Sequence, residues 1–329
     1  MSRPLVVFTD DTVHPAAADM LARTCDLRVL TAYPVEGELM AACAEAQGIL
    51  ARLGTVTRRV IEHAPQLAII ARHGVGVDAV DLAAATEHGV VVTTTGGENA
   101  AAVSEYTFAL LLALVRCVVR ADREMRQGEW SRNPLVGVEL DGRTLGIIGL
   151  GTIGRRVARQ GMGFGMRVLA FDPQLVESGD PAVELVALEQ LLAESDVVTV
   201  HARLTAQTAG LLDAHAFSAM KPTAFFVNTA RGEIVDEPAL IDALMSKSIA
   251  GAALDTYAEE PLPADSVLRQ LDNVVLSPHV AGQTEAALAR VAVCAARSIL
   301  DELAGRRPEH VYNPEAYAVR ARRAKSTNR

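Results

Sequence analysis

Residues 145–154 read Leu-Gly-Ile-Ile-Gly-Leu-Gly-Thr-Ile-Gly, an apolar run that enters a G-x-G-x-x-G pattern. A helical pattern, residues 155–159, follows at once. A glycine-rich turn between a strand and a helix is the arrangement that binds the pyrophosphate of a dinucleotide. Gly149 allows the tight turn, Gly151 lets phosphates approach the backbone, and Gly154 lets helix and strand pack closely.

The start of the following helix completes this predicted site. Its first N–H groups, at Thr152 and Ile153, have no helical partner and lie at the positive end of the helix dipole. The glycine pattern alone is a weak signal, because glycines occur in many turns that bind nothing.

An acidic residue at the expected distance strengthens the interpretation. A second apolar run, residues 167–171, ends in Asp172, eighteen residues after Gly154. A carboxylate at about this distance hydrogen-bonds the ribose hydroxyls of NAD. Pro173 and Gln174 follow, with no basic residue to bind a 2′-phosphate, so the sequence favours NAD over NADP. Taken alone, Asp172 could also be a turn residue before proline.

Length and composition limit the class of protein. The chain has 329 residues, which favours two domains, and half of them are hydrophobic. The net charge of −9 argues against general binding to nucleic acid or to anionic membranes. Four scattered cysteines without C-x-x-C spacing predict free thiols and no metal site, and the N-terminus lacks a signal-peptide pattern, so we expect a cytoplasmic protein.

The chain predicts two α/β domains with doubly wound parallel sheets. Short apolar strands alternate with helices in residues 1–95 and again in residues 144–282. We expect a discontinuous, flavodoxin-like substrate domain of residues 1–98 and 291–329, and a Rossmann NAD domain of residues 99–290. Six strands are expected in the second domain: 144–149, 167–171, 197–201, 224–228, 250–254 and 274–276.

Two segments outside the sheets also carry expectations. Residues 100–119 predict one long helix that is too apolar to lie on a surface, followed by a polar, exposed arm over residues 120–141. The basic tail, residues 315–329, has no apolar period and is expected to fray.

A glycine-rich loop follows the fourth predicted strand of the first domain. Residues 72–78 read Arg-His-Gly-Val-Gly-Val-Asp. Ligands of open parallel sheets bind beyond the carboxyl ends of strands, and Gly74 and Gly76 would let backbone N–H groups face a carboxylate. An ordinary glycine-rich turn is the alternative.

Three polar residues lie at carboxyl ends of strands in the second domain. Arg231, Glu260 and His279 follow the strands that end at residues 228, 254 and 276. Histidine both accepts and returns a proton near neutral pH, and a neighbouring carboxylate fixes its tautomer. A guanidinium binds a carboxylate through two hydrogen bonds. Each residue alone could be structural, but their joint placement indicates oxidation of an alcohol by nicotinamide.

At this point the sequence resembles the D-isomer-specific 2-hydroxyacid dehydrogenases over about residues 40–315. The resemblance rests on six segments, which are RHGVGVDAVD (72–81), NAAAVSEYT (99–107), LDGRTLGIIGLGTIG (140–154), FVNTARG (226–232), GAALDTYAEEP (251–261) and NVVLSPHVAG (273–282).

The resemblance implies roles for individual residues. Arg231, Glu260 and His279 occupy the family's catalytic positions, and the family's substrate-carboxylate loop falls on Val75 and Gly76. The implied cofactor-binding set is Gly149, Gly151, Thr152, Ile153, Gly154, Asp172, His201, Thr229, Ala230, Arg231, Asp255, His279 and Gly282. The implied substrate-binding set is Arg52, His73, Val75, Gly76 and Arg231. A homodimer through the helix that begins near Asn99 is also implied.

Some residues depart from the family pattern. His73 stands where alanine or glycine is common, and Ala202-Arg203 replaces an aliphatic residue followed by proline, which adds a cation near the cofactor. His201 is expected on the adenine side of the cofactor or in the core. Leu53-Gly54 follows Arg52 where phosphoglycerate-specific members continue with polar residues, which weakens a direct assignment of phosphoglycerate.

We therefore expect an NAD-dependent oxidoreductase that acts on a small D-2-hydroxy acid or 2-keto acid. Substrates resembling 3-phosphoglycerate, and glycerate or hydroxypyruvate, both remain open, as does a reductase of glyoxylate. A second acidic group on the substrate is possible because of Arg52, Arg72 and His73. The alternative from another class is a non-catalytic NAD-sensing protein, like the corepressors that share this fold.

Overall fold

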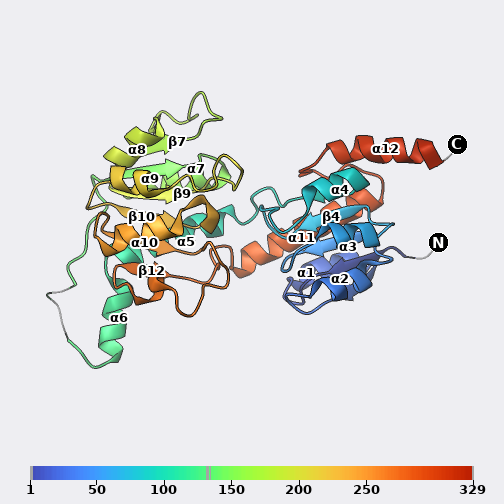
Figure 1. Cartoon of the computed structure of the whole chain (residues 1–329), viewed down its shortest axis with the longest axis horizontal. Coiled ribbons are helices and arrows are strands. Elements are labelled where there is room, and N and C mark those ends of the chain that lie inside the picture. Colours follow the sequence, from blue (N-terminus) through green and yellow to red (C-terminus); the bar gives the residue numbers. More distant parts are fainter. Residues whose placement is uncertain (1–2, 131–132, 134, 328–329) are drawn as a thin grey trace. The chain divides into compact units, whose positions relative to one another are not determined.

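The computed structural model describes residues 3–130, 133 and 135–327. The chain forms two compact units, one of Met1–Asn99 with Thr284–Arg329 and one of Ala100–Gln283. Figure 1 shows the elements of each unit. The chain re-enters the first unit at Thr284, not at residue 291 as expected, because the Thr284 side chain accepts a hydrogen bond from Ala287 N and starts a helix that belongs wholly to that unit.

The first unit is built on a five-stranded parallel sheet. Its strands are β1 (Leu5–Phe8), β2 (Asp26–Val29), β3 (Gly48–Ala51), β4 (Ile69–Arg72) and β5 (Val91–Thr93). The order β2-β1-β3-β4-β5 is that of a flavodoxin-like doubly wound fold. Its helices are α1 (Pro15–Leu21), α2 (Glu36–Cys43), α3 (Arg58–His63), α4 (Leu82–His88), α11 (Glu285–Leu303) and α12 (Glu315–Thr327).

Alternating side chains of the strands fill the two faces of this sheet. Val7 and Ile49 belong to a core cluster with residues of α2, α3 and α4. Val6 and Leu50 belong to the opposite cluster, with residues of α1 and the alanine-rich face of α11. Successive side chains of a strand point to opposite faces, which explains why these buried strands are almost continuously apolar.

The second unit contains a seven-stranded parallel sheet. Its strands are β6 (Thr144–Ile148), β7 (Arg167–Phe171), β8 (Val183–Leu185), β9 (Val197–Val200), β10 (Phe225–Asn228), β11 (Gly251–Leu254) and β12 (Val274–Leu276). The order β12-β11-β10-β9-β6-β7-β8 is the Rossmann order with one added edge strand. The sequence missed β8, an edge strand of three residues that carries the charged Glu184.

Helices cover both faces of the second sheet. They are α5 (Ala100–Val115), α7 (Thr152–Gly163), α8 (Leu188–Glu194), α9 (Ala214–Ala219) and α10 (Glu237–Met245), while α6 (Val118–Arg126) follows α5 and is mostly exposed. Two 3₁₀ turns, Gly232–Ile234 and Val267–Gln270, lie between strands. Residues of α5 and α7 share one core cluster with Leu145 and Ile147, and residues of α8 to α10 share the other with Ile148 and Phe226.

The predicted single helix over residues 100–119 is wrong at its end. The helix stops at Val115, and Cys117 adopts a left-handed conformation with φ of 56° before α6 begins. The backbone N–H of Val138 donates to Val115 O, so the returning chain occupies the end of α5. In the described part of the chain no single helix could cross a bilayer by length and apolarity; α5 and α6 pass only as a pair bent by 63°.

The expectation of a frayed tail is also wrong, because α12 extends from Glu315 to Thr327. Arg320 forms an ion pair with buried Glu302 of α11, and Tyr317 Oη donates to the same carboxylate at 2.8 Å. Arg320 also donates to the carbonyl oxygens of Gly89 and Ala68. Polar anchoring, rather than an apolar stripe, thus holds this helix on the first unit.

Candidate active site

The glycine-rich turn, Gly149–Gly154, has the backbone that phosphate binding needs. Gly149 has φ of +93°, and a Cβ there would lie 2.6 Å from Ala202 N. A Cβ on Gly154 would lie 2.1 Å from Gly149 O. A Cβ on Gly151 would meet no atom within 4 Å, so this face of the turn is open. Two glycines are therefore required by packing, while the third leaves space for a ligand at the backbone.

Helix α7 begins in this open space. Its N-cap is Gly151, and no side chain caps it. The first helical hydrogen bond runs from Arg155 N to Gly151 O, so the N–H groups of Thr152, Ile153 and Gly154 precede it. These donors and the helix dipole suit an anionic phosphate, and the turn fits the diphosphate of a dinucleotide.

Asp172 lies at the carboxyl end of β7, next to β6 in the sheet. Its Oδ2 accepts from Leu150 N at 3.0 Å, and its Oδ1 accepts from Gln174 N at 3.1 Å. Each carboxylate oxygen accepts more than one hydrogen bond, so this half-buried side chain is oriented while it keeps capacity for ribose hydroxyls.

His201, Thr229 and Ala230 lie at neighbouring strand ends. His201 Nε2 is 3.0 Å from Thr199 Oγ1, and its buried Nδ1 has no hydrogen-bond partner among the described residues. Burial lowers the pKa of His201 to about 3, so its ring is neutral at physiological pH. Thr229 Oγ1 is 3.0 Å from Thr107 Oγ1 of α5, and Ala230 N donates to Asn228 Oδ1 at 2.9 Å.

Arg231 is held in a short, rigid turn after β10. Asn228 Nδ2 donates to Arg231 O at 2.8 Å, and Arg231 Nη1 donates to Ala230 O at 2.7 Å. The next residue must be glycine, since a Cβ on Gly232 would lie 1.9 Å from the carbonyl carbon of Tyr257. The loops after β10 and β11 therefore touch directly.

Glu260 and His279 form the central pair of the site. His279 Nδ1 lies 2.7 Å from Glu260 Oε2, with side-chain exposures of 48% and 36%. Burial raises the pKa of Glu260, but the hydrogen bond and charge of His279 and the charge of Arg231 outweigh it and lower that pKa below its ordinary value. His279 and Arg231, two of the predicted catalytic residues, therefore both act electrostatically on the third, Glu260.

The loop that carries His279 is fixed from below by Asp255. This fully buried carboxylate accepts from Ser277 Oγ at 2.6 Å, from Val280 N at 2.9 Å and from Ala281 N at 2.8 Å. His279 itself has φ of 53°, an uncommon conformation for a residue with a Cβ. Asp255 thus holds both sides of the turn that presents the histidine, directly before Gly282.

Tyr257, which sequence reasoning did not select, joins the two loops. Its backbone N–H donates to Glu260 Oε1 at 3.1 Å. Its buried Oη lies 2.8 Å from Ser277 O and 3.1 Å from Leu254 O, and it accepts from Ser277 N at 3.1 Å. An aromatic residue two positions after Asp255 reads as core in the sequence, and only the hydroxyl could have suggested this role.

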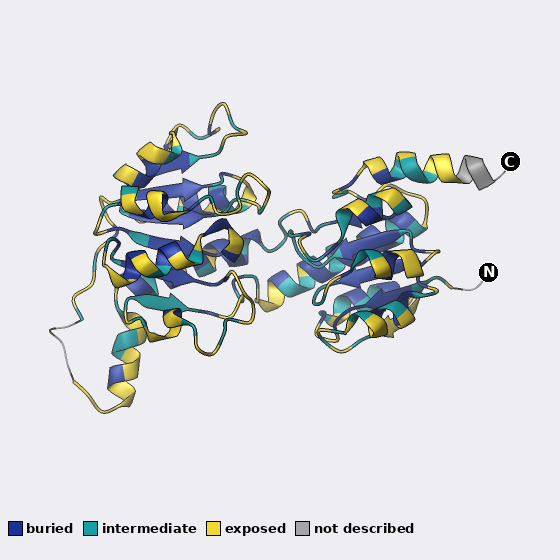
Figure 2. Ribbon diagram, in the orientation of Figure 1, coloured by how far each residue is buried: buried dark blue, intermediate teal, exposed yellow. Residues whose placement is uncertain are grey.

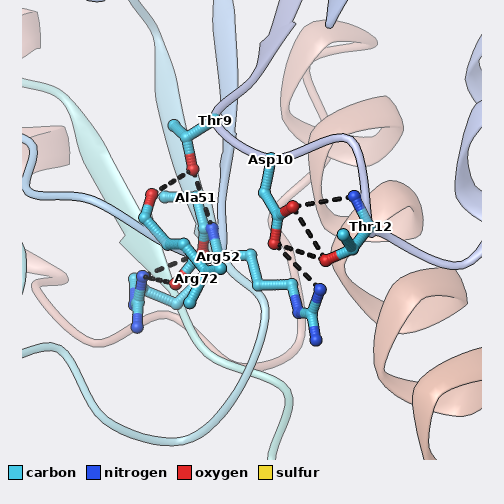
Figure 3. A network of polar contacts seen from close by, with 7 residues as sticks. Thr9, Asp10, Thr12, Ala51, Arg52 and Arg72 are labelled. Atoms are coloured by element: carbon cyan, nitrogen blue, oxygen red, sulfur yellow. Dashed lines mark hydrogen bonds and ion pairs between the residues drawn. The ribbon is translucent and has the colours of Figure 1, made fainter. Parts of the chain in front are cut away.

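The first unit carries a second group of predicted site residues, at the carboxyl ends of β1, β3 and β4. Arg52 Nη1 lies 2.8 Å from Asp10 Oδ2, and Arg52 is 12% exposed while Asp10 is fully buried. Asp10 also accepts from Thr12 N at 2.7 Å, as Figure 3 shows. The sequence missed Asp10, although its place directly after the first strand follows the rule that identified the other candidates.

Arg72 and His73 border the glycine-rich loop of this unit. Arg72 Nε donates to Gly76 O at 3.0 Å, and its Nη1 donates to Ala51 O at 2.9 Å. Burial and the charge of Arg52 lower the pKa of His73 to about 4, and its buried Nε2 has no hydrogen-bond partner among the described residues. Val75 and Gly76 follow, half-buried, in the loop that Arg72 holds.

Comparison with known proteins identifies similar sequences and structures. The family model described as "D-isomer specific 2-hydroxyacid dehydrogenase, NAD binding domain" matches residues 108–281. A glyoxylate reductase of Thermofilum pendens is 39% identical over 97% of both chains. A D-3-phosphoglycerate dehydrogenase of Archaeoglobus fulgidus is 42% identical over 91% of this chain, which spans 57% of that protein.

Solved structures agree with these relatives. The structure of the TT0316 protein from Thermus thermophilus superposes with a TM-score of 0.88 and 36% identity, covering 94% of this chain and 99% of that one. The similarity therefore includes both parallel-sheet units.

Proposed function

We propose that this chain, which belongs to the D-isomer-specific 2-hydroxyacid dehydrogenase family, interconverts a small D-2-hydroxy acid and its 2-keto acid with NAD as cofactor. The observation that carries the proposal is the 2.7 Å contact between His279 Nδ1 and Glu260 Oε2, with Arg231 electrostatically coupled to the pair. A general acid–base, an orienting carboxylate and a carboxylate-binding cation are the protein groups this reaction needs.

His279 moves the proton in this proposal. Because His279 Nδ1 is hydrogen-bonded to Glu260, the other ring nitrogen, Nε2, is the one that we assign to the substrate. In alcohol oxidation Nε2 accepts the hydroxyl proton, and the Glu260 carboxylate stabilises the imidazolium that results. In keto-acid reduction the imidazolium returns the proton to the carbonyl oxygen. The nicotinamide ring, when bound, supplies or removes the hydride.

Arg231 binds the substrate carboxylate through its guanidinium and polarises the neighbouring carbonyl group. For the first unit, we keep the backbone of Val75 and Gly76 as proposed substrate-binding groups. Gly149, Gly151, Thr152, Ile153 and Gly154 are assigned to the diphosphate and Asp172 to the adenosine ribose. We keep His201, Thr229, Ala230, Arg231, Asp255, His279 and Gly282 as cofactor residues, with Asp255 acting through the loop whose hydrogen bonds it accepts.

The substrate class is proposed from the charges of the first unit. Arg52 and Arg72 contribute two positive charges and Asp10 one negative charge, while His73 is neutral at pH 7. One net positive charge suits a polar or anionic group on the third carbon, as in glycerate, hydroxypyruvate or 3-phosphoglycerate. The name of one relative, D-3-phosphoglycerate dehydrogenase, is consistent with this range, whereas glyoxylate, in the name of the other, has no third carbon.

Steady-state kinetics test the proposal. Glyoxylate, hydroxypyruvate and pyruvate would be reduced with NADH and with NADPH, and D-glycerate, D-lactate and 3-phosphoglycerate would be oxidised with NAD. We expect turnover with a D-2-hydroxy acid, no turnover with its L-isomer, and higher kcat/KM for hydroxypyruvate than for pyruvate. Binding of NADH without turnover of any of these acids would contradict the proposal and favour a sensor of the cofactor.

We also propose a homodimer in the cytoplasm, formed through the second unit. Helix α5, which begins next to Asn99, is mostly buried inside its own unit, and five of the large exposed apolar side chains of the described residues lie on α6 and the segment after it. Val118, Val119 and Met125 are more than half exposed, and Trp130 and Val136 are about four-fifths exposed. Figure 2 shows α6 as a largely exposed helix. We propose these exposed apolar side chains as the contact surface, because large apolar areas exposed on a protein are often interaction sites.

Light scattering tests the assembly. The chain mass is 34.9 kDa, and we expect twice this value in solution. Val119→Asp with Met125→Asp should yield a monomer, whereas Val29→Asp on the first unit should not change the mass. A wild-type monomer at micromolar concentration would contradict the homodimer and leave the catalytic proposal intact.

A further inference from the structure

Arg203 lies beside the glycine-rich turn. Strand β9 pairs with β6, and His201 N, directly after β9, donates to Ile148 O at 2.7 Å. The next residue, Ala202, packs closely against Gly149. A Cβ added to Gly149 would lie 2.6 Å from Ala202 N. Consecutive Cα atoms are about 3.8 Å apart, so Arg203 starts one residue beyond a direct contact with this turn.

The backbone of Arg203 is fixed while its side chain is exposed. Thr208 Oγ1 donates to Arg203 O at 2.6 Å, and Thr205 N donates to Thr208 Oγ1 at 2.8 Å. No acidic side chain of the described residues pairs with the Arg203 guanidinium, in a chain whose net charge is −9. A structural ion pair therefore does not explain why Arg203 lies next to the glycine-rich turn.

The sheet order separates this cation from the ribose-binding acid. Strands β9 and β7 lie on opposite sides of β6, so Arg203 and Asp172 flank the glycine-rich turn from its two sides. A 2′-phosphate would extend from the ribose that Asp172 binds. The diphosphate, which lies on the turn itself, is the group that both neighbouring strand ends can reach.

We propose that Arg203 pairs with the diphosphate of the bound dinucleotide and supplies a large part of the ionic contribution to cofactor affinity. The backbone N–H groups of α7 position the diphosphate by hydrogen bonds, and Arg203 neutralises its charge from the side of β9. This inference rests on the proposed cofactor site but holds for any 2-hydroxy acid substrate.

Nucleotide binding to the full-length chain, measured without substrate, tests the inference. Kd values for NADH would be measured by its fluorescence, and those for ADP, adenosine and adenosine 2′,5′-bisphosphate by displacement. Arg203→Ala should raise the Kd of NADH and of ADP about 3- to 10-fold, with adenosine changed less than about 2-fold. Arg203→Lys should recover part of the loss, and added salt should weaken wild-type binding more steeply than that of Arg203→Ala.

The matched control is Arg159→Ala. Arg159 is exposed on α7 and lies about 12 Å along the helix from Gly151. The Arg159→Ala variant should have the same Kd as wild type for each nucleotide. An equal loss for adenosine and ADP, a loss confined to the 2′,5′-bisphosphate, or unchanged NADH binding in Arg203→Ala would each overturn the inference. A wild-type chain that binds no NADH would instead overturn the proposed function itself.

Discussion

His279 Nδ1 lies 2.7 Å from Glu260 Oε2, although the two residues come from different loops, after β12 and β11. The two loops are joined by Tyr257, which bonds to Glu260 Oε1 through its N–H and to Ser277 through its hydroxyl. Because both partners are partly exposed, the pair contributes little to stability and much to the orientation of the imidazole.

Replacing His279 by alanine should remove the general acid–base and leave cofactor binding intact. We expect kcat to fall by about 10²- to 10⁴-fold in both directions, the usual contribution of a positioned acid–base. NADH titration of the variant should give a Kd within about 2-fold of wild type, since the glycine-rich turn and Asp172, which are assigned to the diphosphate and the ribose, are unchanged. Near-normal turnover would contradict the assigned role.

Glu260→Gln should separate orientation of the histidine from its charge. The amide can still accept a hydrogen bond from Nδ1, but it no longer stabilises the imidazolium. We expect kcat for keto-acid reduction to fall by about 10-fold or more. Because reduction needs the protonated histidine, the loss of activity with rising pH should begin at a lower pH than in wild type. The control is Glu259→Gln, an exposed neighbour that should have a wild-type pH profile. Identical profiles for Glu260→Gln and wild type would rule out the electrostatic role.

Asp172 should set the preference for NAD over NADP. Its oriented carboxylate would repel a 2′-phosphate and bind ribose hydroxyls. Asp172→Ser should weaken NADH about 10-fold and raise the ratio of kcat/KM for NADPH to that for NADH by at least the same factor. Glu177→Ser, in the same exposed loop, should leave the ratio unchanged. A constant ratio in Asp172→Ser would show that another residue selects the cofactor.

Much of the second unit could be predicted because its function and its fold use the same residues. A Cβ on Gly149 or Gly154 would make contacts of 2.6 and 2.1 Å, which no side chain tolerates, so the glycine pattern correctly predicted the tight turn. Arg231, Glu260 and His279 follow predicted strands, and parallel strands bring their carboxyl ends to one edge. Strand β8 was missed because its apolar residues, Val183 and Leu185, flank an exposed charge in a segment too short to show a period.

The positioning residues could not be predicted, since their roles depend on tertiary contacts. Asp255 is separated from Ala281 by 26 residues, and Asp10 from Arg52 by 42, so neither pairing has a local signal. Helix α12 was expected to fray for the same reason. Its anchor, Glu302, lies on another helix, and propensity alone does not record an ion pair with Arg320.

The low pKa of His73, a half-buried residue with a buried Nε2 atom, predicts acid sensitivity of the first unit. Burial and the charge of Arg52 lower its pKa to about 4 in the folded chain, below the ordinary value of 6.5. Between these pH values the unfolded chain binds a proton at His73 that the folded chain does not. The contribution of neutral His73 to the free energy of unfolding is therefore fully present above pH 6.5 and is lost as the pH falls toward 4. The expected slope is at most about 1.4 kcal/mol per pH unit.

Urea unfolding of wild type and His73→Gln at pH 7, 6 and 5 measures this effect. The variant should lose less stability on acidification than wild type, because glutamine does not titrate. His63→Gln is the control, since His63 is exposed on α3 in the same unit and should unfold like wild type at each pH. Parallel stability curves for His73→Gln and wild type would show that the histidine is not held neutral.

The ion pair between Asp10 and Arg52 should make Asp10 essential to the first unit. Asp10→Ala removes the carboxylate from a guanidinium that is 12% exposed and removes the acceptor of Thr12 N. Taking one partner from a buried pair costs about 3–5 kcal/mol, so the urea midpoint of the first unit should fall sharply. Asp11→Ala, an exposed neighbour, should be neutral.

The double variant Asp10→Ala with Arg52→Met should be more stable than Asp10→Ala, because no buried cation remains to be solvated. Additive losses in the double variant would show that the two side chains do not stabilise each other.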